Sequence, residues 1–166
     1  YCYTGGPFPL AYRGLGDVVV LLFFGVVAVG GVYFLNTGRW DWPAGLAGLQ
    51  IGLLATVLIA INNLRDHVTD RKANKRTLAV RWGVKGAKLQ IALLCLTPFL
   101  GAVFWYAWGY KGAALLPLFS FPLALKISEK VYATEPGVLY NQFLAQAALL
   151  HFLFGVFFSL GLIQIF

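Results

Sequence analysis

The sequence predicts an all-α membrane protein, a polytopic bundle of about five transmembrane helices. Hydrophobic residues make up 60% of the 166 residues and charged residues only 11%, which is unlike a soluble globular domain. The apolar residues form five runs, most of them near the ~20 residues that a helix needs to cross ~30 Å of hydrocarbon. The runs lack the alternation of a barrel strand, and an open sheet cannot satisfy its backbone groups in lipid.

The five spans form a single transmembrane domain, residues 1–166, because the connecting loops are too short for a second domain. We predict the spans at about residues 18–35, 43–61, 89–108, 112–127 and 139–166. The second contains a Gly48-x-x-x-Gly52 pair, which lets a neighbouring helix approach closely. The fourth is short and contains Pro117 and Pro122, so we expect it to be kinked or tilted. His151 in the fifth is a group that either bonds between helices or takes part in function.

The basic residues predict the orientation of the bundle. With five alternating spans, eleven of the thirteen Lys and Arg residues fall on one side, and only Arg39 and Lys111 fall on the other. The positive-inside rule therefore places the connection at residues 62–88 in the cytoplasm. Trp and Tyr residues on the opposite side fit an interfacial aromatic belt. Nucleic-acid binding explains the charge poorly, because the basic residues lie in short loops without a recognition motif.

The connection after the second span concentrates the charge of the chain. Ten of the nineteen charged residues lie between Arg65 and Lys88. If the second span continues as a helix, Asn62, Asp66 and Asp70 follow one another at four-residue spacing on one face. Two carboxylates one turn apart can hold a Mg²⁺ ion that keeps several waters and takes its other ligands from phosphates. The alternative is a solvated, salt-bridged helix face with no ligand.

A stripe of cations lies beside the two acids. Arg65, Lys72 and Arg76 recur near helical spacing, and their side chains can donate to phosphate oxygens. A metal ion and cations together stabilise a departing diphosphate. The pattern thus predicts a site for a diphosphate at the cytoplasmic mouth of the bundle.

The charged segment resembles the second aspartate-rich motif of the UbiA superfamily of intramembrane prenyltransferases. It is closest to the branch that prenylates 1,4-dihydroxy-2-naphthoate, with the pattern Asn-Asn-x-Arg-Asp-x-x-x-Asp-x-x-x-Gly-Lys-x-Thr-Leu-Ala. The matching residues here are Asn62-Asn63-Leu64-Arg65-Asp66, Asp70 and Lys75-Arg76-Thr77-Leu78-Ala79. Asn74 replaces the glycine of the pattern, and asparagine is the next residue most able to enter a left-handed turn. His67 also stands where an apolar or acidic residue is expected.

The opening of the chain gives a second match. Residues 3–7 resemble the Tyr-Thr-Gly-Gly-Pro loop that leads into a transmembrane helix of the family from the cytoplasmic side. Its glycines and prolines indicate an ordered, turn-rich loop, although a mere connecting loop is the simpler interpretation of each residue. The candidates for capping a substrate are Tyr3, Thr4, Tyr12 and Arg13.

The resemblance implies a nine-helix bundle around a central cavity, of which this chain supplies five helices. The sequence contains no methionine and lacks the family's first aspartate-rich motif. We therefore expect it to be the C-terminal part of a longer protein, inactive alone. The implied location is the inner or plasma membrane of a bacterial cell.

The implied reaction transfers a polyprenyl group from polyprenyl diphosphate to 1,4-dihydroxy-2-naphthoate, with loss of diphosphate and CO₂, and gives demethylmenaquinone. Asp66 and Asp70 would bind Mg²⁺ together with Asn62 or Asn63. The resemblance makes Arg65, Lys72, Lys75 and Arg76 the diphosphate-binding candidates. Two alternatives remain open: a family member with another aromatic acceptor, and a transporter of an anionic lipid or metabolite.

Overall fold

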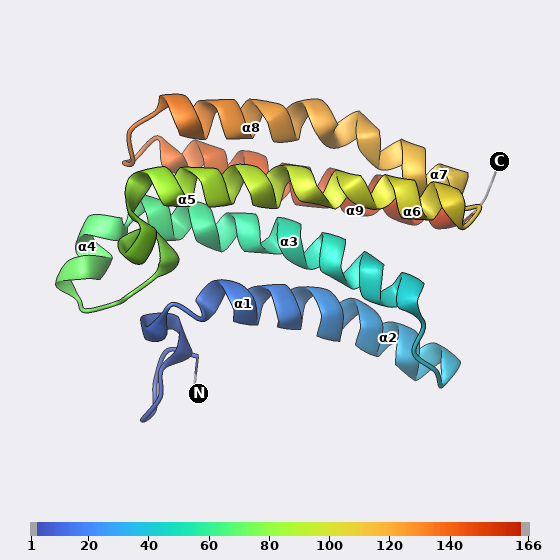
Figure 1. Ribbon diagram of the computed structural model, residues 1–166, viewed down its shortest axis with the longest axis horizontal. Helices are drawn as coiled ribbons and strands as arrows, with labels where there is room; N and C mark the ends of the chain where they lie inside the picture. Colours follow the sequence, from blue (N-terminus) through green and yellow to red (C-terminus); the bar gives the residue numbers. More distant parts are fainter. Residues whose placement is uncertain (1–2, 164–166) are drawn as a thin grey trace.

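The computed structural model describes residues 3–163, and these are almost entirely helical. Five long helical segments run side by side and alternate in direction (Figure 1). Each is long and apolar enough to cross a membrane: Gly16–Thr37, Trp42–Arg65, Leu78–Ala107, Lys111–Ala133 and Tyr140–Leu162. The predicted fold class is confirmed, and the chain is an integral membrane protein.

The second span is the centre of the bundle. It forms one helix, α3 (Trp42–Arg65), which packs against the first span, against α5 (Leu78–Leu96) and against α9 (Tyr140–Leu162). Leu54, Val57, Ile61 and Leu64 on this helix are almost completely buried. α8 (Phe121–Ala133) covers α5 and α9, on the side of the bundle away from the first span (Figure 1).

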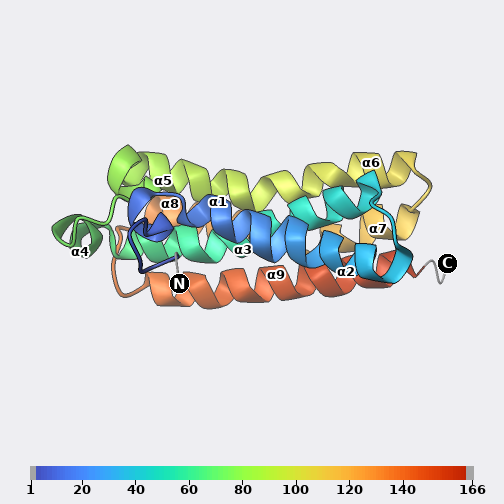
Figure 2. The ribbon, with the colours of Figure 1, turned by 90° about the horizontal axis from the view of Figure 1, so that it is seen from below.

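The first span packs against α3 through glycines. It consists of α1 (Gly16–Val20), a π-helical stretch (Leu21–Val27) and α2 (Ala28–Thr37), and it lies along α3 in both views of the ribbon (Figures 1 and 2). A Cβ atom on Gly25 would overlap the backbone of Gly48 and Gly52. The prediction that the Gly48–Gly52 pair permits a close helix approach is therefore confirmed.

Prolines interrupt the third and fourth spans. The fourth consists of α7 (Lys111–Leu115), a 3₁₀ segment with Pro117 (Leu116–Ser120) and α8, so the predicted break in the helix is confirmed. The prediction that this span is short is wrong, because it runs over 23 residues, Lys111–Ala133. The third span has a similar break: a 3₁₀ segment, Thr97–Gly101, follows α5 and leads into α6 (Ala102–Ala107). Gln50 donates to the carbonyl of Pro98 within this break, at 2.6 Å.

Residues 62–88 are mostly helical, which differs from the predicted loop. α3 runs to Arg65, a short helix α4 (His67–Lys72) follows, and α5 already starts at Leu78. The side chain of Thr77 caps α5 by accepting from the amide of Val80. Gly83 has non-helical φ/ψ angles and divides α5, so the regular helix of the third span starts about five residues before the predicted position. The end of the predicted fifth span, residues 164–166, lies outside the described residues.

Candidate functional site

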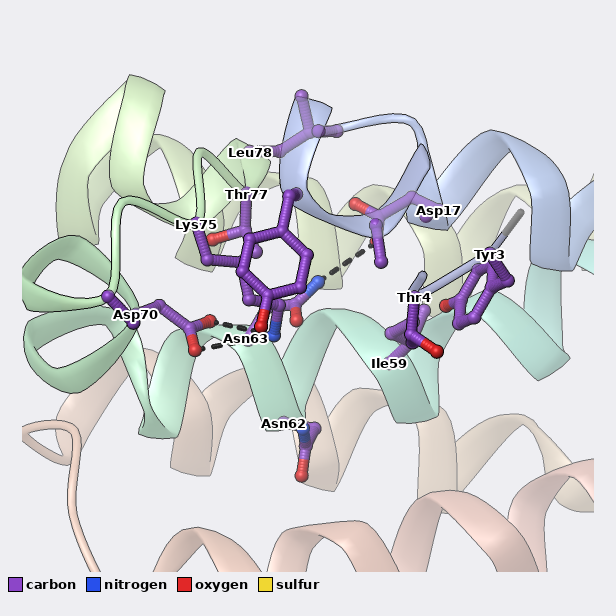
Figure 3. A pocket seen from close by; sticks show the side chains of 15 residues that line it. Tyr3, Thr4, Asp17, Ile59, Asn62, Asn63, Asp70, Lys75, Thr77 and Leu78 are labelled. Carbon is purple, nitrogen blue, oxygen red and sulfur yellow. Dashed lines mark hydrogen bonds and ion pairs between the residues drawn. The ribbon is translucent and has the colours of Figure 1, made fainter. Parts of the chain in front are cut away.

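A cavity of about 420 Å³ opens at the end of the bundle where α3 finishes and α5 begins, which we call the pocket end (Figure 3). Its walls come from the N-terminal loop, the start of α1, the last turns of α3 and the segment from α4 to α5. The lining residues are Tyr3, Thr4, Ala11, Tyr12, Gly14, Gly16, Asp17, Ile59, Asn62, Asn63, Asp70, Ala73, Lys75, Thr77 and Leu78.

The N-terminal loop is attached to the segment before α5. The amide of Arg76 donates to the carbonyl of Tyr12 at 2.9 Å. The guanidinium of Arg81 donates to the carbonyls of Arg13 and Arg76, at 2.7 and 3.1 Å. Gly14 has φ +74°, and a Cβ there would lie 2.6 Å from the Arg76 carbonyl oxygen. Only glycine fits this position without strain, so the loop can close one side of the cavity.

The two motif acids point to different surroundings. The helix breaks at Asp66, where φ is −98° and ψ is 8°, before α4 begins. Asp70 is buried and lines the cavity, whereas Asp66 is not among the lining residues. The prediction of one continuous helical face for Asn62, Asp66 and Asp70 is therefore wrong. The chain turns at Asp66, directly after α3 ends at Arg65.

Asp66 belongs to a cluster between α3 and α9. The Arg65 guanidinium donates to both carboxylate oxygens of Asp66, at 2.8 and 2.7 Å. It also donates to the side-chain oxygens of Asn62 and Asn141, at 2.7 and 2.6 Å. The hydrogen bonds from Arg65 hold the pKa of the Asp66 carboxyl below its usual value. Asp66 is consequently ionised at neutral pH, and Arg65 fixes its position rather than facing the cavity.

Asp70 faces the cavity beside a single ammonium group. Lys75 Nζ lies 3.3 and 3.1 Å from the two carboxylate oxygens of Asp70, and both side chains are largely buried. The turn that brings Lys75 back passes through Asn74, whose φ is +55°. The prediction that asparagine replaces the motif glycine in a left-handed turn is confirmed. A cation therefore already bridges the Asp70 carboxylate.

A second carboxylate, Asp17, lies on the other side of the cavity, and the site prediction did not include it. It is 6% exposed. Its Oδ1 accepts from Asn63 Nδ2 at 3.2 Å, and its Oδ2 accepts from Gln90 Nε2 at 2.8 Å. Figure 3 shows Asn63 between Asp17 and Asp70. An acid at the entrance of an apolar span was the sequence signal for a functional position.

Three of the four capping candidates line the cavity: Tyr3, Thr4 and Tyr12. Burial, and then the charge of Asp17, raise the pKa of the Tyr3 hydroxyl, so Tyr3 remains a neutral donor. Arg13 lies outside the lining and stacks on the ring of Phe8, with 3.4 Å between guanidinium carbon and ring centroid.

The cationic stripe of Arg65, Lys72 and Arg76 does not line the cavity. Of the four diphosphate-binding candidates only Lys75 lies in the lining, and Arg65 is engaged with Asp66. Lys72 and Arg76 have exposed side chains outside the lining. These two cations therefore face solvent outside the cavity rather than its interior.

The donor set determines what kind of metal the site suits. No three His, Cys, Asp or Glu side chains come together within residues 3–163 in a way that could hold a metal ion. Asp70 and Asn63 nevertheless bring a carboxylate and a carboxamide oxygen to the cavity, whereas the side-chain oxygen of Asn62, which also lies at the lining, is bonded to Arg65. Such a set fits Mg²⁺, which keeps several waters and shares its ligands with phosphates, and does not fit an all-protein metal cage. The residues present therefore fit a hydrated Mg²⁺ ion.

Comparison with known proteins agrees with this geometry. Residues 1–150 match the model of the UbiA prenyltransferase family. The chain belongs to the UbiA prenyltransferase family. Several residues of the motif that resembles this family line the cavity, among them the two asparagines Asn62 and Asn63.

Several curated proteins are similar to this member of the family. A 1,4-dihydroxy-2-naphthoate octaprenyltransferase of Haemophilus influenzae is 39% identical over 97% of the chain and 53% of its own length. A protein of the same name in Mycobacterium leprae is 36% identical, over 82% of the chain and 46% of its length. A 2-carboxy-1,4-naphthoquinone phytyltransferase of Synechocystis is 28% identical over 97% and 53%. The chain spans about half the length of these relatives.

Proposed function

We propose that the protein transfers a polyprenyl group from polyprenyl diphosphate to 1,4-dihydroxy-2-naphthoate, in the biosynthesis of menaquinone. The observation that carries the proposal is the cavity at the pocket end, where Asp70, Asn63 and Lys75 meet at the mouth of an apolar bundle. The names of the relatives support the naphthoate acceptor over other aromatic acids. The bilayer is the second partner, because a polyprenyl chain is as apolar as the helices.

The residues have distinct roles in this proposal. Asp70, with the side-chain oxygen of Asn63, would hold Mg²⁺, and Asn62 and Asp66, whose oxygens bond to Arg65 in this structure, would complete the set. When bound, the ion supplies charge neutralisation for a leaving diphosphate. Lys75 is poised to exchange Asp70 for a phosphate oxygen, while Arg65 keeps Asp66 ionised and fixed. Lys72 and Arg76 would attract the diphosphate from outside.

The chemistry balances without a further reagent. The allylic C–O bond breaks and its electron pair leaves with the diphosphate. The ring carbon that carries the carboxylate forms the new C–C bond, and loss of CO₂ returns an electron pair to the ring. Tyr3, whose raised pKa keeps it protonated, is placed to donate a hydrogen bond within the cavity. Thr4 and Tyr12 would close the cavity over the substrate, and Arg13 would meet its charge at the rim.

The orientation belongs to the proposal as well. Eleven of the thirteen basic residues are expected on the side of the pocket end, so this end would face the cytoplasm. Both water-soluble groups, the diphosphate and the naphthoate carboxylate, are then delivered from the cytoplasm. The membrane would be the inner or plasma membrane of a bacterial cell.

The direct test is product formation by the intact gene product in membranes. Labelled polyprenyl diphosphate and 1,4-dihydroxy-2-naphthoate should give a prenylated naphthoquinol when Mg²⁺ is present, and chelation should stop the reaction. Residues 1–166 expressed alone should give no product. Preference for 4-hydroxybenzoate or homogentisate would contradict the assigned acceptor, and uptake of substrate without a new C–C bond would contradict prenyl transfer altogether.

A further inference from the structure

Asp17 is a buried carboxylate without an ion pair to any described residue. Moving an ionised carboxylate out of water is costly unless hydrogen bonds compensate. Here each carboxylate oxygen accepts from a side-chain amide, Asn63 at 3.2 Å and Gln90 at 2.8 Å. The three residues come from α1, α3 and α5, which are far apart in the sequence. Asp17 therefore connects three spans at the wall of the cavity.

The hydrogen bond to Asp17 fixes which way the Asn63 amide points. A carboxylate only accepts hydrogen bonds, so it selects the amide nitrogen of Asn63 and turns the amide oxygen away from itself. Asn63 is 5% exposed and lines the cavity, and no described residue donates to its Oδ1. Gln90 holds the other carboxylate oxygen and prevents Asp17 from rotating. The oxygen of Asn63 is thus free for a ligand in the cavity.

We infer that Asp17, held by Gln90, is a positioning residue that presents the Asn63 oxygen to a Mg²⁺–diphosphate ligand in the cavity. The inference rests on the proposed function, which places that ligand beside Asp70 and Asn63. Groups that orient a metal ligand change metal affinity by about ten- to a hundred-fold when they are removed. Asp17 itself touches neither metal nor substrate in this assignment.

The experiment measures ligand binding rather than activity. The intact protein is purified in detergent, and its melting temperature is recorded against Mg²⁺ concentration in the presence of inorganic pyrophosphate. A ligand that binds only the folded state raises the melting temperature in a saturable way, which gives an apparent affinity. The wild type should need both Mg²⁺ and pyrophosphate for this rise.

Asp17→Leu removes the acceptor for Asn63 and keeps the number and branching of the side-chain heavy atoms. It should weaken Mg²⁺–pyrophosphate binding about ten- to a hundred-fold. The matched control is Asp41→Leu, because Asp41 accepts from Tyr33 and pairs with Arg39 at the opposite end of the bundle. That control should leave the apparent affinity unchanged, even where it shifts the melting temperature of the free protein.

The double variant Asp17→Asn with Gln90→Glu keeps the test decisive if Asp17→Leu does not fold. The amide introduced at position 17 would donate to the carboxylate introduced at position 90 and would still accept from Asn63. The orientation of Asn63 is then preserved while the charge moves to α5, so the Mg²⁺–pyrophosphate affinity should equal that of the wild type. A tenfold loss in this double variant would show that the charge of Asp17 acts directly and would overturn the positioning role.

Two further outcomes separate this inference from the proposed function. If the wild type binds Mg²⁺–pyrophosphate but forms no prenylated product, the proposed function fails and the positioning role stands. If the wild type shows no Mg²⁺-dependent stabilisation by pyrophosphate, or if Asp17→Leu binds as well as the wild type, the inference is overturned.

Discussion

The two ends of the bundle use buried polar groups in opposite ways. At the end opposite the cavity, Gln50 donates to the Pro98 carbonyl at 2.6 Å and accepts from Trp105 Nε1 at 2.7 Å. Both the nitrogen and the oxygen of its amide are therefore hydrogen-bonded to the interrupted third span. At the pocket end, Asn63 donates to Asp17, and its oxygen points to a cavity. A buried amide is structural in the first case and available to a ligand in the second.

The packing around the two amides, Gln50 and Asn63, also differs. Trp105 packs edge-on against Trp108, Tyr110 and Phe158, with ring centroids 5.0 to 5.8 Å apart. A Cβ on Gly112 would lie 2.7 Å from the carbonyl oxygen of Gly161, so α7 and α9 touch through their backbones. Both ends contain an open volume, about 420 Å³ at the pocket end and about 500 Å³ at the opposite end, but only the one at the pocket end is lined by charged side chains. Substitutions at the two ends should therefore affect different measurements.

The largest effect is expected at the carboxylate that faces the cavity. Asp70→Asn removes the charge from the proposed Mg²⁺ site and should lower prenyl transfer by the intact protein by roughly a hundred-fold or more. The protein should remain folded in membranes, because only the Lys75 ion pair is lost. Full transfer by Asp70→Asn at ordinary Mg²⁺ concentrations would exclude this carboxylate as a ligand.

Asp66→Asn tests whether the cluster between α3 and α9 belongs to the same site. We expect a loss of transfer of similar size, because Asp66 is proposed as the second acid of the metal site. Asp41→Asn, at the opposite end, is the matched control and should transfer normally. Should Asp66→Asn transfer like this control, the Arg65 cluster would be a structural contact between helices.

Arg65→Lys should have the next largest effect. One guanidinium reaches Asp66, Asn62 and Asn141 at once, and a lysine ammonium cannot reproduce that planar pattern. Losing a charge-assisted hydrogen bond costs about 1.5–3 kcal/mol, or roughly ten- to a hundred-fold in affinity or rate. The readout is the apparent KM for polyprenyl diphosphate together with kcat. Lys126→Gln, an exposed cation on α8, should leave both unchanged.

A smaller and different effect is expected at the opposite end. Gln50→Leu leaves the Trp105 N–H and the Pro98 carbonyl without their partner in a buried site. We expect a loss of about 1–3 kcal/mol in the free energy of unfolding, measured by denaturant titration in detergent micelles. The Mg²⁺ concentration for half-maximal transfer should stay the same below the unfolding range. A shift in that concentration would mean that the two ends are coupled.

The sequence was sufficient for the helices because their apolar runs are long and their breaks contain proline, as at Pro117. It was not sufficient for the site, because a helix that ends in charged residues can turn between two of them. Asp66 and Asp70 therefore separated despite their four-residue spacing. Lys88 shows the same limit: its position in the sequence indicates a loop cation, yet it is buried and donates to the carbonyl of Tyr132 at 3.1 Å.

Partners distant in sequence explain most of the remaining differences. Asp17 and Gln90 meet Asn63 across three spans, and no local pattern connects them. Asn141 likewise reaches Arg65 from α9. The motif residues predicted where the ligand-binding side chains lie. The groups that orient those side chains depend on how the helices pack. This division is expected, because spacing along one helix specifies a face but not what the face meets.

The smallest predicted effect is the contribution of Asp66 to stability at acid pH. Its pKa lies below the usual value because of the hydrogen bonds from Arg65. The lowered pKa stabilises the folded state at every pH above the unfolded value of about 3.9, and this contribution disappears as pH falls through the folded pKa. Wild type and Asp66→Asn should therefore show a constant difference in melting temperature from pH 8 to 5, and a smaller one below about pH 4. A difference that instead shrank between pH 8 and 6 would mean that Asp66 titrates near neutrality, against the pairing with Arg65.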